Sequence, residues 1–590
     1  MLLSILLAAI LPSAPDTLQA VTVVADRGMV VSRTDTVLVD SFTDVSSALM
    51  TVPGLYVGDY GGNSALKSVS LRGLGSAHTA IYLDGVRVGN LQSGQADLGF
   101  LDPDNISSVV VDYAQNSLSF NTSRPVFDDD RDVAGKVRMS GGSFGTWRPH
   151  ARLDFELSDD IALSTSFAAE GYKGNFPLVD GTLRDNNDLR RFRGGVDLFV
   201  PGLHVKAYAN GSKRGTPGSL SYPSTDRQDD VNGFVQASWV NAFTPRYELR
   251  VSAKGSYDKL YYHSQWGDSD YRQTEIQLNT AQRYAINSWL SASFAADLQW
   301  DGLSGNVYQE SRLGTVAVAA LAAATSRIKA DISVEYDGAF EKGGKSWNCI
   351  SPSADIRFSL LEGLDVTAFA RRAYRTPTFN ELYYPGYGNK DLKPEDALLT
   401  DLGIDYHRSF GSWTLKARAD GFFNSLRDKI ISAPSADDPM VWLPYNVGKV
   451  VAWGADLLAG AYYAEGDWKA CATVRYGFQK ALDKTPDSYT FDQQIPYVAR
   501  HTVTADASLG WKGWSLQAVF NLRSGRVDAG GDMPSWNTLD LSAGKEFTFG
   551  NGLSVAAKVI ARNLTGTRYE IIRDYPMPGR SLLGGLEFRF

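Results

Sequence analysis

The stretch HTVTADASLGWKGWSLQAVFNLR, from His501 to Arg523, decides the fold class. Every second residue from Val503 to Trp511 is apolar, and the residues between them are polar or glycine. After Lys512-Gly513 the alternation resumes from Trp514 to Leu522. Successive side chains of a β-strand point to opposite faces, so this pattern predicts two strands joined by a tight turn, each with one apolar and one polar face.

The same pattern continues from about Val133 to Phe590. A soluble β-sandwich would also alternate, but two features favour a membrane barrel. The polar faces carry full charges, as a wet lumen permits: Asp506, Asp540, Lys558 and Arg562. Tight connections, such as Lys512-Gly513, alternate with long ones, such as Ser524 to Ser535, which is the scheme of outer-membrane barrels.

The number of strands follows from the length of residues 133–590. At roughly ten residues per membrane crossing and a similar average connection, this region predicts about 22 antiparallel strands. A barrel of that size has a lumen too wide for side chains alone to fill, so a separate domain has to close it.

The region before residue 133 predicts such a domain, a mixed α+β plug over residues 31–132. Ser41 to Met50 suggests a short helix, and Pro103 to Val111 suggests another short helix, a turn and a strand. The alternating runs on either side of Asp84-Gly85 predict a hairpin. Gly73-Leu74-Gly75 is not followed by a helical pattern, so a dinucleotide-binding loop lacks its required context.

The first 14 residues, MLLSILLAAILPSA, predict a signal peptide over residues 1–14, because the apolar run is short and ends in small residues. No later stretch is apolar for 18 residues. The net charge of −8 argues against nucleic-acid binding, and the six scattered histidines and two distant cysteines form no metal motif. No motif brings a nucleophile and a base together, so we expect no enzyme and no required cofactor.

Several motifs in order resemble the TonB-dependent outer-membrane receptors over nearly the whole chain. They are PDTLQAVTVVADR (15–27), VPGLYV (52–57), SVSLRGLGSAHTAIYLDGVRVGN (68–90), ADLGFLDPDNISSVVV (96–111), GGSFGTW (141–147), YRTPTFNELYYPGYGNKDLKPED (374–396) and RNLTGTRYEIIRDYPMPGRSLLGGLEFRF (562–590). Residues 112–135 depart from the family pattern, which usually has Gly-Pro and Tyr-Gly segments there, so the shape of the late plug stays open.

The resemblance implies energy-coupled uptake across the outer membrane of a Gram-negative bacterium. Residues 15–30 would hold the TonB box and a linker, and the box would pair by strand addition with TonB of the inner-membrane complex. The box residues are Leu18, Gln19, Ala20, Val21, Thr22, Val23 and Val24. An ordinary first plug strand is the alternative for this segment. Arg72, Gly73, Asp84 and Gly85 would be plug scaffold, with Arg72 either in an ion pair or against the barrel wall.

The length and the plug loops DYGGNSALKS and VGNLQSGQADLG look most like the cobalamin receptors of this family. By that resemblance the ligand contacts at the plug apex are Asn63, Ser64, Leu66, Asn90, Leu91, Gln92, Ser93 and Gln95. Amides and hydroxyls suit a large, nearly neutral corrinoid, whereas an anionic siderophore would call for a basic pocket. Polar loops that merely face water are the other interpretation of these residues.

Two further ligand classes stay open: a ferric siderophore, and solutes passing through a passive porin-like channel. Some relatives order their loops with Ca²⁺, and oxygen-rich loops are suitable ligands for that ion. The candidate residues are Asp128, Asp129, Asp130, Asp185 and Asp188, although no spacing fits an EF-hand. Some relatives also carry a surface lipoprotein over the barrel, and the resemblance leaves open whether this chain does. The barrel itself would contact outer-membrane lipids.

Overall fold

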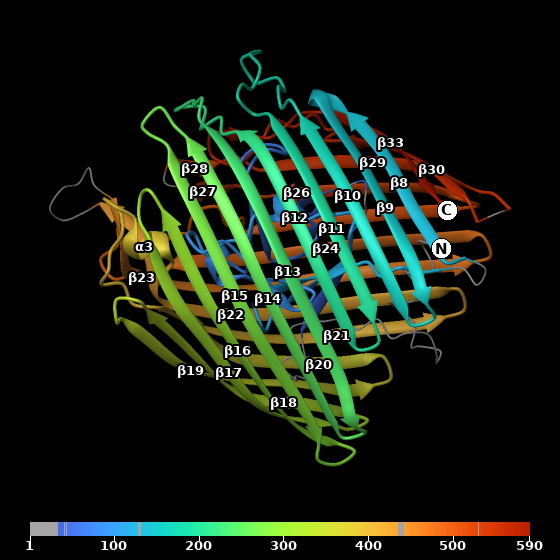
Figure 1. Cartoon of the computed structure of the whole chain (residues 1–590), viewed down its shortest axis with the longest axis horizontal. Coiled ribbons are helices and arrows are strands. Elements are labelled where there is room, and N and C mark those ends of the chain that lie inside the picture. Colours follow the sequence, from blue (N-terminus) through green and yellow to red (C-terminus); the bar gives the residue numbers. More distant parts are fainter. Residues whose placement is uncertain are drawn as a thin grey trace.

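The structure, a computed structural model, describes residues 33–39, 42, 44–127, 131–434, 442–528, 530–550 and 552–590. Within these ranges, 22 antiparallel strands close into a barrel around a small N-terminal plug, which confirms the predicted fold (Figure 1). The TonB-box residues Leu18 to Val24 and the signal peptide lie outside the described residues.

The barrel strands follow one another around the wall, and the last one, β33, pairs with the first one, β8, to close it. Their bounds are β8 Val133–Gly142, β9 Thr146–Ser158, β10 Ile161–Tyr172, β11 Leu189–Val200, β12 Leu203–Gly215, β13 Arg227–Thr244, β14 Tyr247–His263, β15 Ser269–Ala285, β16 Leu290–Gly305, β17 Glu310–Ala324, β18 Ile328–Glu341, β19 Ser346–Leu361, β20 Leu364–Arg375, β21 Glu395–Phe410, β22 Trp413–Pro434, β23 Trp442–Glu465, β24 Trp468–Asp483, β25 His501–Trp511, β26 Trp514–Arg523, β29 Trp536–Thr548, β30 Ser554–Arg562 and β33 Ser581–Arg589.

Alternation along each strand separates a lipid face from a lumen face. In β33 the side chains of Leu586 and Phe588 are 48% and 43% exposed, whereas Glu587 between them is fully buried. Tryptophans gather beside the short turns, where Trp468 stacks on Trp511 with 5.4 Å between ring centroids. Aromatic side chains favour the interface between membrane and water, so this row marks one edge of the spanning band.

The two ends of the barrel differ in the length of their connections. At one end, here called the short-turn end, the strands are joined by tight turns such as 201–202 and 512–513. At the other, the long-loop end, the main connections are 173–188, 216–226, 376–394, 484–500, 524–535 and 563–580. They hold the helix α3 (Phe379–Tyr383) and the short strands β27 (Arg526–Asp528), β28 (Gly531–Met533), β31 (Glu570–Ile572) and β32 (Tyr575–Pro576).

The plug, drawn in blue inside the barrel in Figure 1, contains a five-stranded sheet in the order β1-β6-β7-β4-β5 and a separate β2–β3 hairpin. Its elements are β1 Thr34–Leu38, α2 Val45–Leu49, β2 Leu55–Asp59, β3 Lys67–Leu71, η1 Ser76–His78, β4 Ala80–Leu83, β5 Val86–Val88, η2 Leu98–Phe100, β6 Ile106–Asp112 and β7 Ser117–Thr122. Apolar side chains from β2, β3, β4 and β6 pack with α2 into one core.

The Asp84-Gly85 pair forms the predicted turn between β4 and β5. Both residues have positive φ, +48° and +83°, which is the geometry that favours Asp-Gly in tight hairpins. The Asp84 carboxylate also accepts hydrogen bonds from the Thr122 backbone N–H at 2.8 Å and the Thr122 hydroxyl at 2.6 Å. The turn therefore ties the hairpin to the end of β7.

One predicted plug element is wrong in part. The strand within Pro103 to Val111 is present as β6, but the helix before it is replaced by a turn. The Asp102 carboxylate accepts a hydrogen bond from the Asp104 N–H at 3.2 Å, a local turn contact that competes with a helix. A short 3₁₀ helix, η2, lies earlier in the chain. Within residues 112–135, whose shape the sequence left open, strand β7 pairs in parallel with β4.

Among the described residues, no helix is both long and apolar enough to cross a membrane.

Candidate functional site

The plug loop 60–66 lies against the connections of the long-loop end. The Ser64 hydroxyl donates to the Asn187 side-chain oxygen at 2.5 Å, and the Asn187 amide donates to the Gly61 carbonyl at 3.2 Å. Gly61 has φ +99°, and a Cβ there would lie 2.8 Å from the Pro576 carbonyl oxygen, so glycine is required at this close approach. The loop is therefore fitted between connections 173–188 and 563–580.

The plug loop 90–95 is shaped by Asn90 and pressed against the wall. The Asn90 side-chain oxygen accepts hydrogen bonds from the backbone N–H groups of Gln92 and Ser93, both at 3.0 Å. The Leu91 N–H donates to the Gln273 side chain at 2.9 Å, and the Asn380 N–H of α3 donates to the Gln92 carbonyl at 3.0 Å. Connection 376–394 thus covers part of this loop.

Sequence reasoning missed α3, which covers loop 90–95. A sequence signal for this helix was present, because Thr378 and Glu381 have the spacing of a capping box. They form one in the structure: the Glu381 N–H donates to the Thr378 hydroxyl at 3.3 Å, and the Thr378 N–H donates to the Glu381 carboxylate at 2.7 Å. The Phe379 side chain of α3 packs with Leu91 and Tyr271, which fixes α3 over the plug.

The eight residues nominated as ligand contacts differ in accessibility. Ser64 and Gln92 are buried, at 2% and 6% exposed. Leu66 and Ser93 are exposed, and Asn63, Asn90, Leu91 and Gln95 are half-buried. The Arg214 guanidinium of β12 joins loop 60–66 to the segment that follows loop 90–95, since it donates to the Ser64 carbonyl at 3.1 Å and to the Asp97 carboxylate at 3.2 Å. Both loops therefore stand at the long-loop end, with Leu66 and Ser93 as their most accessible nominated side chains.

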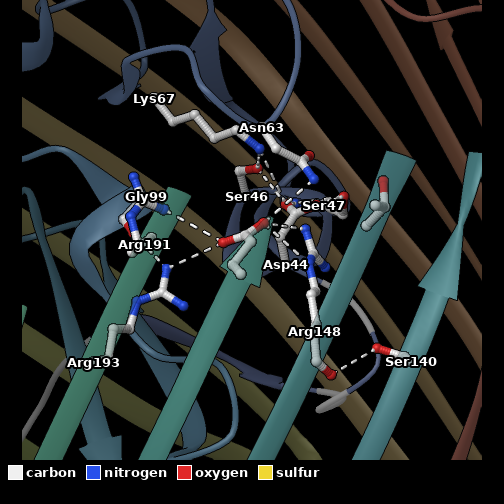
Figure 2. Close-up of polar contacts among 12 residues, drawn as sticks. Asp44, Ser46, Ser47, Asn63, Lys67, Gly99, Ser140, Arg148, Arg191 and Arg193 are labelled. Carbon is white, nitrogen blue, oxygen red and sulfur yellow. Dashed lines mark hydrogen bonds and ion pairs between the residues drawn. The ribbon is translucent and has the colours of Figure 1, made fainter. Parts of the chain in front are cut away.

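A charged cluster fastens the plug to the first barrel strands beneath loop 60–66. The carboxylate of Glu170, on β10, accepts from Arg148 at 3.0 Å and from the Asn63 amide at 3.4 Å. Arg191 and Arg193 lie 3.6 and 3.7 Å from the same carboxylate. Arg148 comes from β9, and Arg191 and Arg193 come from β11; Figure 2 shows Arg148 near Asp44 and Arg191 near Gly99 of the plug. Three arginines therefore surround one wall carboxylate, and the plug carboxylates of Asp44 and Asp97 add negative charge beside Arg148 and Arg191.

On the plug side of this cluster, Lys67 is buried between the carboxylates of Asp44 and Asp59, at 3.7 and 3.6 Å (Figure 2 labels Lys67 and Asp44). Burial works to lower the pKa of Lys67, but the two carboxylates outweigh it and raise the pKa above its usual value. Lys67 therefore stays charged and ties the start of β3 to α2 and to β2.

Arg72 forms a second connection between plug and wall. Its guanidinium pairs with Asp401 of β21 at 2.7 Å and with Asp456 of β23 at 3.0 Å. It also lies over the rings of Tyr113 and Phe422, with 4.3 and 4.4 Å to the centroids. The ion pair and the wall contact that the sequence offered as alternatives occur together in one residue.

Arg72→Ala is expected to weaken plug docking by about 3–5 kcal/mol, because it leaves the Asp401 and Asp456 carboxylates buried without their main cation. Protease cleavage of the plug during a urea titration measures this loss. Adding Asp401→Asn and Asp456→Asn to Arg72→Ala should recover part of it. Arg580→Ala, at an exposed arginine, is the control. An unchanged urea midpoint of plug cleavage in Arg72→Ala would show that this contact does not stabilise plug docking.

Beside α2 and β1 the plug does not fill the lumen. A cavity of about 870 Å³ lies between these elements and the wall, and it is lined by residues from Thr34 to Leu38 of β1, by His407 near the short-turn end and by Gly579 at the long-loop end. Arg418, the sixth residue after the short turn 411–412, pairs with Asp35 at 2.5 Å. The first described residues thus lie towards the short-turn end.

The calcium prediction is not tested by these contacts. Asp128, Asp129 and Asp130 lie outside the described residues. Asp188 pairs with Arg227 at 2.7 Å, and the Asp185 carboxylate accepts from the Asn186 N–H at 2.8 Å. Within the part of the chain that the structure describes, no three His, Cys, Asp or Glu side chains are grouped to hold a metal. Calcium binding stays a prediction that loop order with and without Ca²⁺ would check.

Two family models match the chain. The model described as "TonB dependent receptor-like, beta-barrel" matches residues 82–560, and the model described as "TonB-dependent Receptor Plug Domain" matches residues 16–125. Among curated proteins, the chain is similar to a "Vitamin B12 transporter BtuB" of Vibrio vulnificus, at 22% identity over 93% of this chain and 90% of the relative. The protein of the same name from Photobacterium profundum is also 22% identical, over 92% and 90%.

Solved structures share the fold at low identity. The copper transporter OprC matches with a TM-score of 0.77 at 14% identity, covering 94% of this chain and 99% of that one. The FrpB iron transporter of Neisseria meningitidis matches with a TM-score of 0.76 at 15% identity, covering 94% and 99%. The ferric citrate transporter FecA matches with a TM-score of 0.75 at 12% identity, covering 95% and 97%. With the plugged barrel and both family models in agreement, the chain belongs to the TonB-dependent receptor family.

Proposed function

We propose that this TonB-dependent outer-membrane transporter takes up cobalamin or a related corrinoid. The observation that carries the proposal is the pair of plug loops 60–66 and 90–95 at the long-loop end of the barrel, where the Ser93 hydroxyl is exposed and the amides of Asn63, Asn90 and Gln95 are partly accessible. Such groups suit a large ligand rich in amides. The two curated relatives named as vitamin B12 transporters, each matched over at least nine-tenths of both chains, favour the same ligand.

The barrel lies in the outer membrane of a Gram-negative bacterium, where its apolar face and tryptophan row contact lipid. We infer that ligand binds at the long-loop end, facing outward, and that TonB engages Leu18 to Val24 at the short-turn end. Ion pairs such as Arg72–Asp401 hold the plug in place, so transport requires work to move it. This favours coupled uptake over a porin. The proposed activity is transport, with no catalytic step.

A ferric siderophore is the second candidate ligand, and a specific observation favours it. Some of the structural matches are iron and siderophore transporters, and the plug side of loop 60–66 faces the arginines around Glu170. Basic surroundings suit an anionic ligand.

Equilibrium binding to the detergent-purified full-length chain distinguishes the two candidate ligands. One set of titrations uses cyanocobalamin, and the other uses a panel of ferric siderophores. Tight binding of cyanocobalamin alone supports the corrinoid proposal, and tight binding of a ferric siderophore alone overturns it.

Ser93→Trp is expected to lower the affinity for the bound ligand by at least tenfold. Ser93 is exposed at the tip of loop 90–95, so an indole there fills ligand space without entering the plug core. Ser107→Trp is the matched control, because Ser107 is also an exposed plug serine, and it lies on β6, where its carbonyl accepts from the Val39 N–H and not from a long loop. Isothermal titration of both variants checks this. Equal affinities would show that loop 90–95 faces water and does not contact the ligand.

A further inference from the structure

A second cavity, of about 240 Å³, lies between the β2–β3 hairpin of the plug and the wall near the long-loop end. Tyr56 of β2 lines it from the plug, and Lys429, Gln479 and Arg523 line it from strands β22, β24 and β26. Residues 495–499 of connection 484–500 and Arg526 of connection 524–535 complete the lining. We call this cavity the anion pocket, for the following reasons.

Within the described part of the chain, none of the pocket's three cations forms a close ion pair, although the carboxylates of Glu395 and Asp483 act on Lys429 and those of Glu570 and Asp528 act on Arg526 from farther away. Arg523 donates to the backbone carbonyls of Met50 at 2.7 Å and Leu522 at 3.1 Å. Arg526 likewise donates to backbone carbonyls, among them that of Pro534 at 3.3 Å. Lys429 forms no ion pair with a described acidic residue. Carbonyl oxygens fix the direction of a guanidinium but leave its full charge in place.

The pocket lining supplies little negative charge of its own. Among the described lining residues, Asp456 is the one acidic side chain, and it already pairs with Arg72 at 3.0 Å. Burying charges without counter-charge costs free energy, which a bound anion would offset. The pocket lining therefore carries an excess of positive charge, which carboxylates outside the lining offset only from a distance.

Two neutral donors also point to a missing acceptor. The Tyr56 hydroxyl and the Gln479 amide nitrogen are buried and have no hydrogen-bond partner among the described residues. Burial raises the pKa of Tyr56, so its hydroxyl remains protonated and can donate. A group that accepts from two neutral donors beside three cations is an oxyanion, since charge-assisted hydrogen bonds to such groups are the strong ones.

We propose that the anion pocket binds an oxyanion arm, a phosphate ester or a carboxylate, of the transported ligand. The inference rests on the proposed function and deepens it. The cavity is smaller than the roughly 300–1,000 Å³ of sites that hold a whole drug-sized molecule, so it takes one arm of a larger ligand. Complete corrinoids carry a phosphodiester in the nucleotide tail, and hydroxycarboxylate siderophores carry carboxylates. Both sources share the oxyanion chemistry.

The test uses the detergent-purified full-length chain, its Lys429→Gln variant and four probes: cyanocobalamin, cobinamide (which lacks the phosphodiester), ferric citrate and pyrophosphate. Lys429→Gln removes one charge from a side chain that holds no ion pair, so the fold is expected to survive. We expect wild type to bind cyanocobalamin at least about tenfold more tightly than cobinamide, the size of one charged hydrogen bond. Lys429→Gln should remove that difference and leave cobinamide binding unchanged, while Lys429→Arg should retain it.

Lys449→Gln, at an exposed lysine on the adjacent strand β23 that does not line the pocket, is the matched control. Tight and equal binding of cyanocobalamin and cobinamide, unchanged in Lys429→Gln, would overturn the anion pocket and leave the corrinoid proposal standing. A third outcome is that the wild type binds ferric citrate or pyrophosphate but neither corrinoid, and that Lys429→Gln loses this binding. That outcome would support the anion pocket and overturn the corrinoid proposal. If no probe depends on Lys429, the inference is wrong.

Discussion

Deletion of Leu18 to Val24 is expected to reduce uptake of cyanocobalamin to background while leaving its equilibrium affinity unchanged. The plug is held by ion pairs that include Arg72–Asp401 and Arg33–Asp420. Breaking these ion pairs during transport requires an energy input in addition to ligand binding on the outer side. A partner that pairs with the box by strand addition can pull on the plug from the inner side. Without the box, the receptor should bind cyanocobalamin but not release it into the periplasm.

Two measurements on the same variant check this expectation: accumulation of labelled cyanocobalamin in cells, and titration of the purified protein. Val21→Pro is a finer version, since proline removes a backbone donor that strand pairing uses, and Val21→Ala is its control. Proline should act like the deletion and alanine like the wild type. Undiminished accumulation after deletion would mean that ligand enters without coupling, as through a porin.

Removal of residues 31–132 is expected to turn a nearly closed protein into a wide open channel. The lumen of a barrel of this size is an aqueous passage unless a domain fills it. In the full chain the plug leaves a side cavity of about 870 Å³ lined by charged residues of both plug and wall. Conductance of single molecules in planar bilayers should therefore rise by more than an order of magnitude on plug removal.

The full-length chain is the control for this measurement, and Arg72→Ala tests whether loosening the plug produces intermediate openings. If the full-length chain already conducts as well as the barrel without its plug, the side cavity is a continuous passage. Passive permeation would then account for transport, and the coupling proposal would fail.

The barrel could be predicted from the sequence because its signal is periodic and repeated. The strand number came out right partly because two deviations cancel: strands such as β23, with 24 residues, are longer than the assumed ten, while turns such as 512–513 are much shorter than the assumed connections. The lumen charges and the Asp84-Gly85 hairpin were equally local signals. Where a competing local contact intervened, as at Asp102, the helix prediction was wrong.

The candidate site could be predicted only as two loops, because its surroundings come from residues distant in sequence. Nothing near Gln92 indicates that Asn380 of α3 covers it or that Gln273 holds its neighbour. The anion pocket shows the same limit more strongly. Lys429, Arg523 and Arg526 are unremarkable polar residues until closure of the barrel brings β22, β26 and connection 524–535 around the plug.

Coverage of loop 90–95 by α3 also bears on how ligand reaches it. Gln92 is buried under connection 376–394, while Ser93 next to it is exposed. In the proposed binding mode, a ligand therefore touches the tip of the loop without any movement, whereas contact with Gln92 requires α3 to shift. If connection 376–394 moves on binding, hydrogen exchange at Asn380, whose N–H is bonded to the Gln92 carbonyl, reports it.

The central claim, coupled uptake of a corrinoid, is tested most directly by accumulation of cobalt-labelled cyanocobalamin in cells that carry this chain as their sole outer-membrane receptor. The account predicts accumulation that saturates with concentration and stops when a protonophore collapses the inner-membrane gradient. Accumulation that rises linearly and ignores the protonophore, or no accumulation in cells that still take up a ferric siderophore, would contradict it.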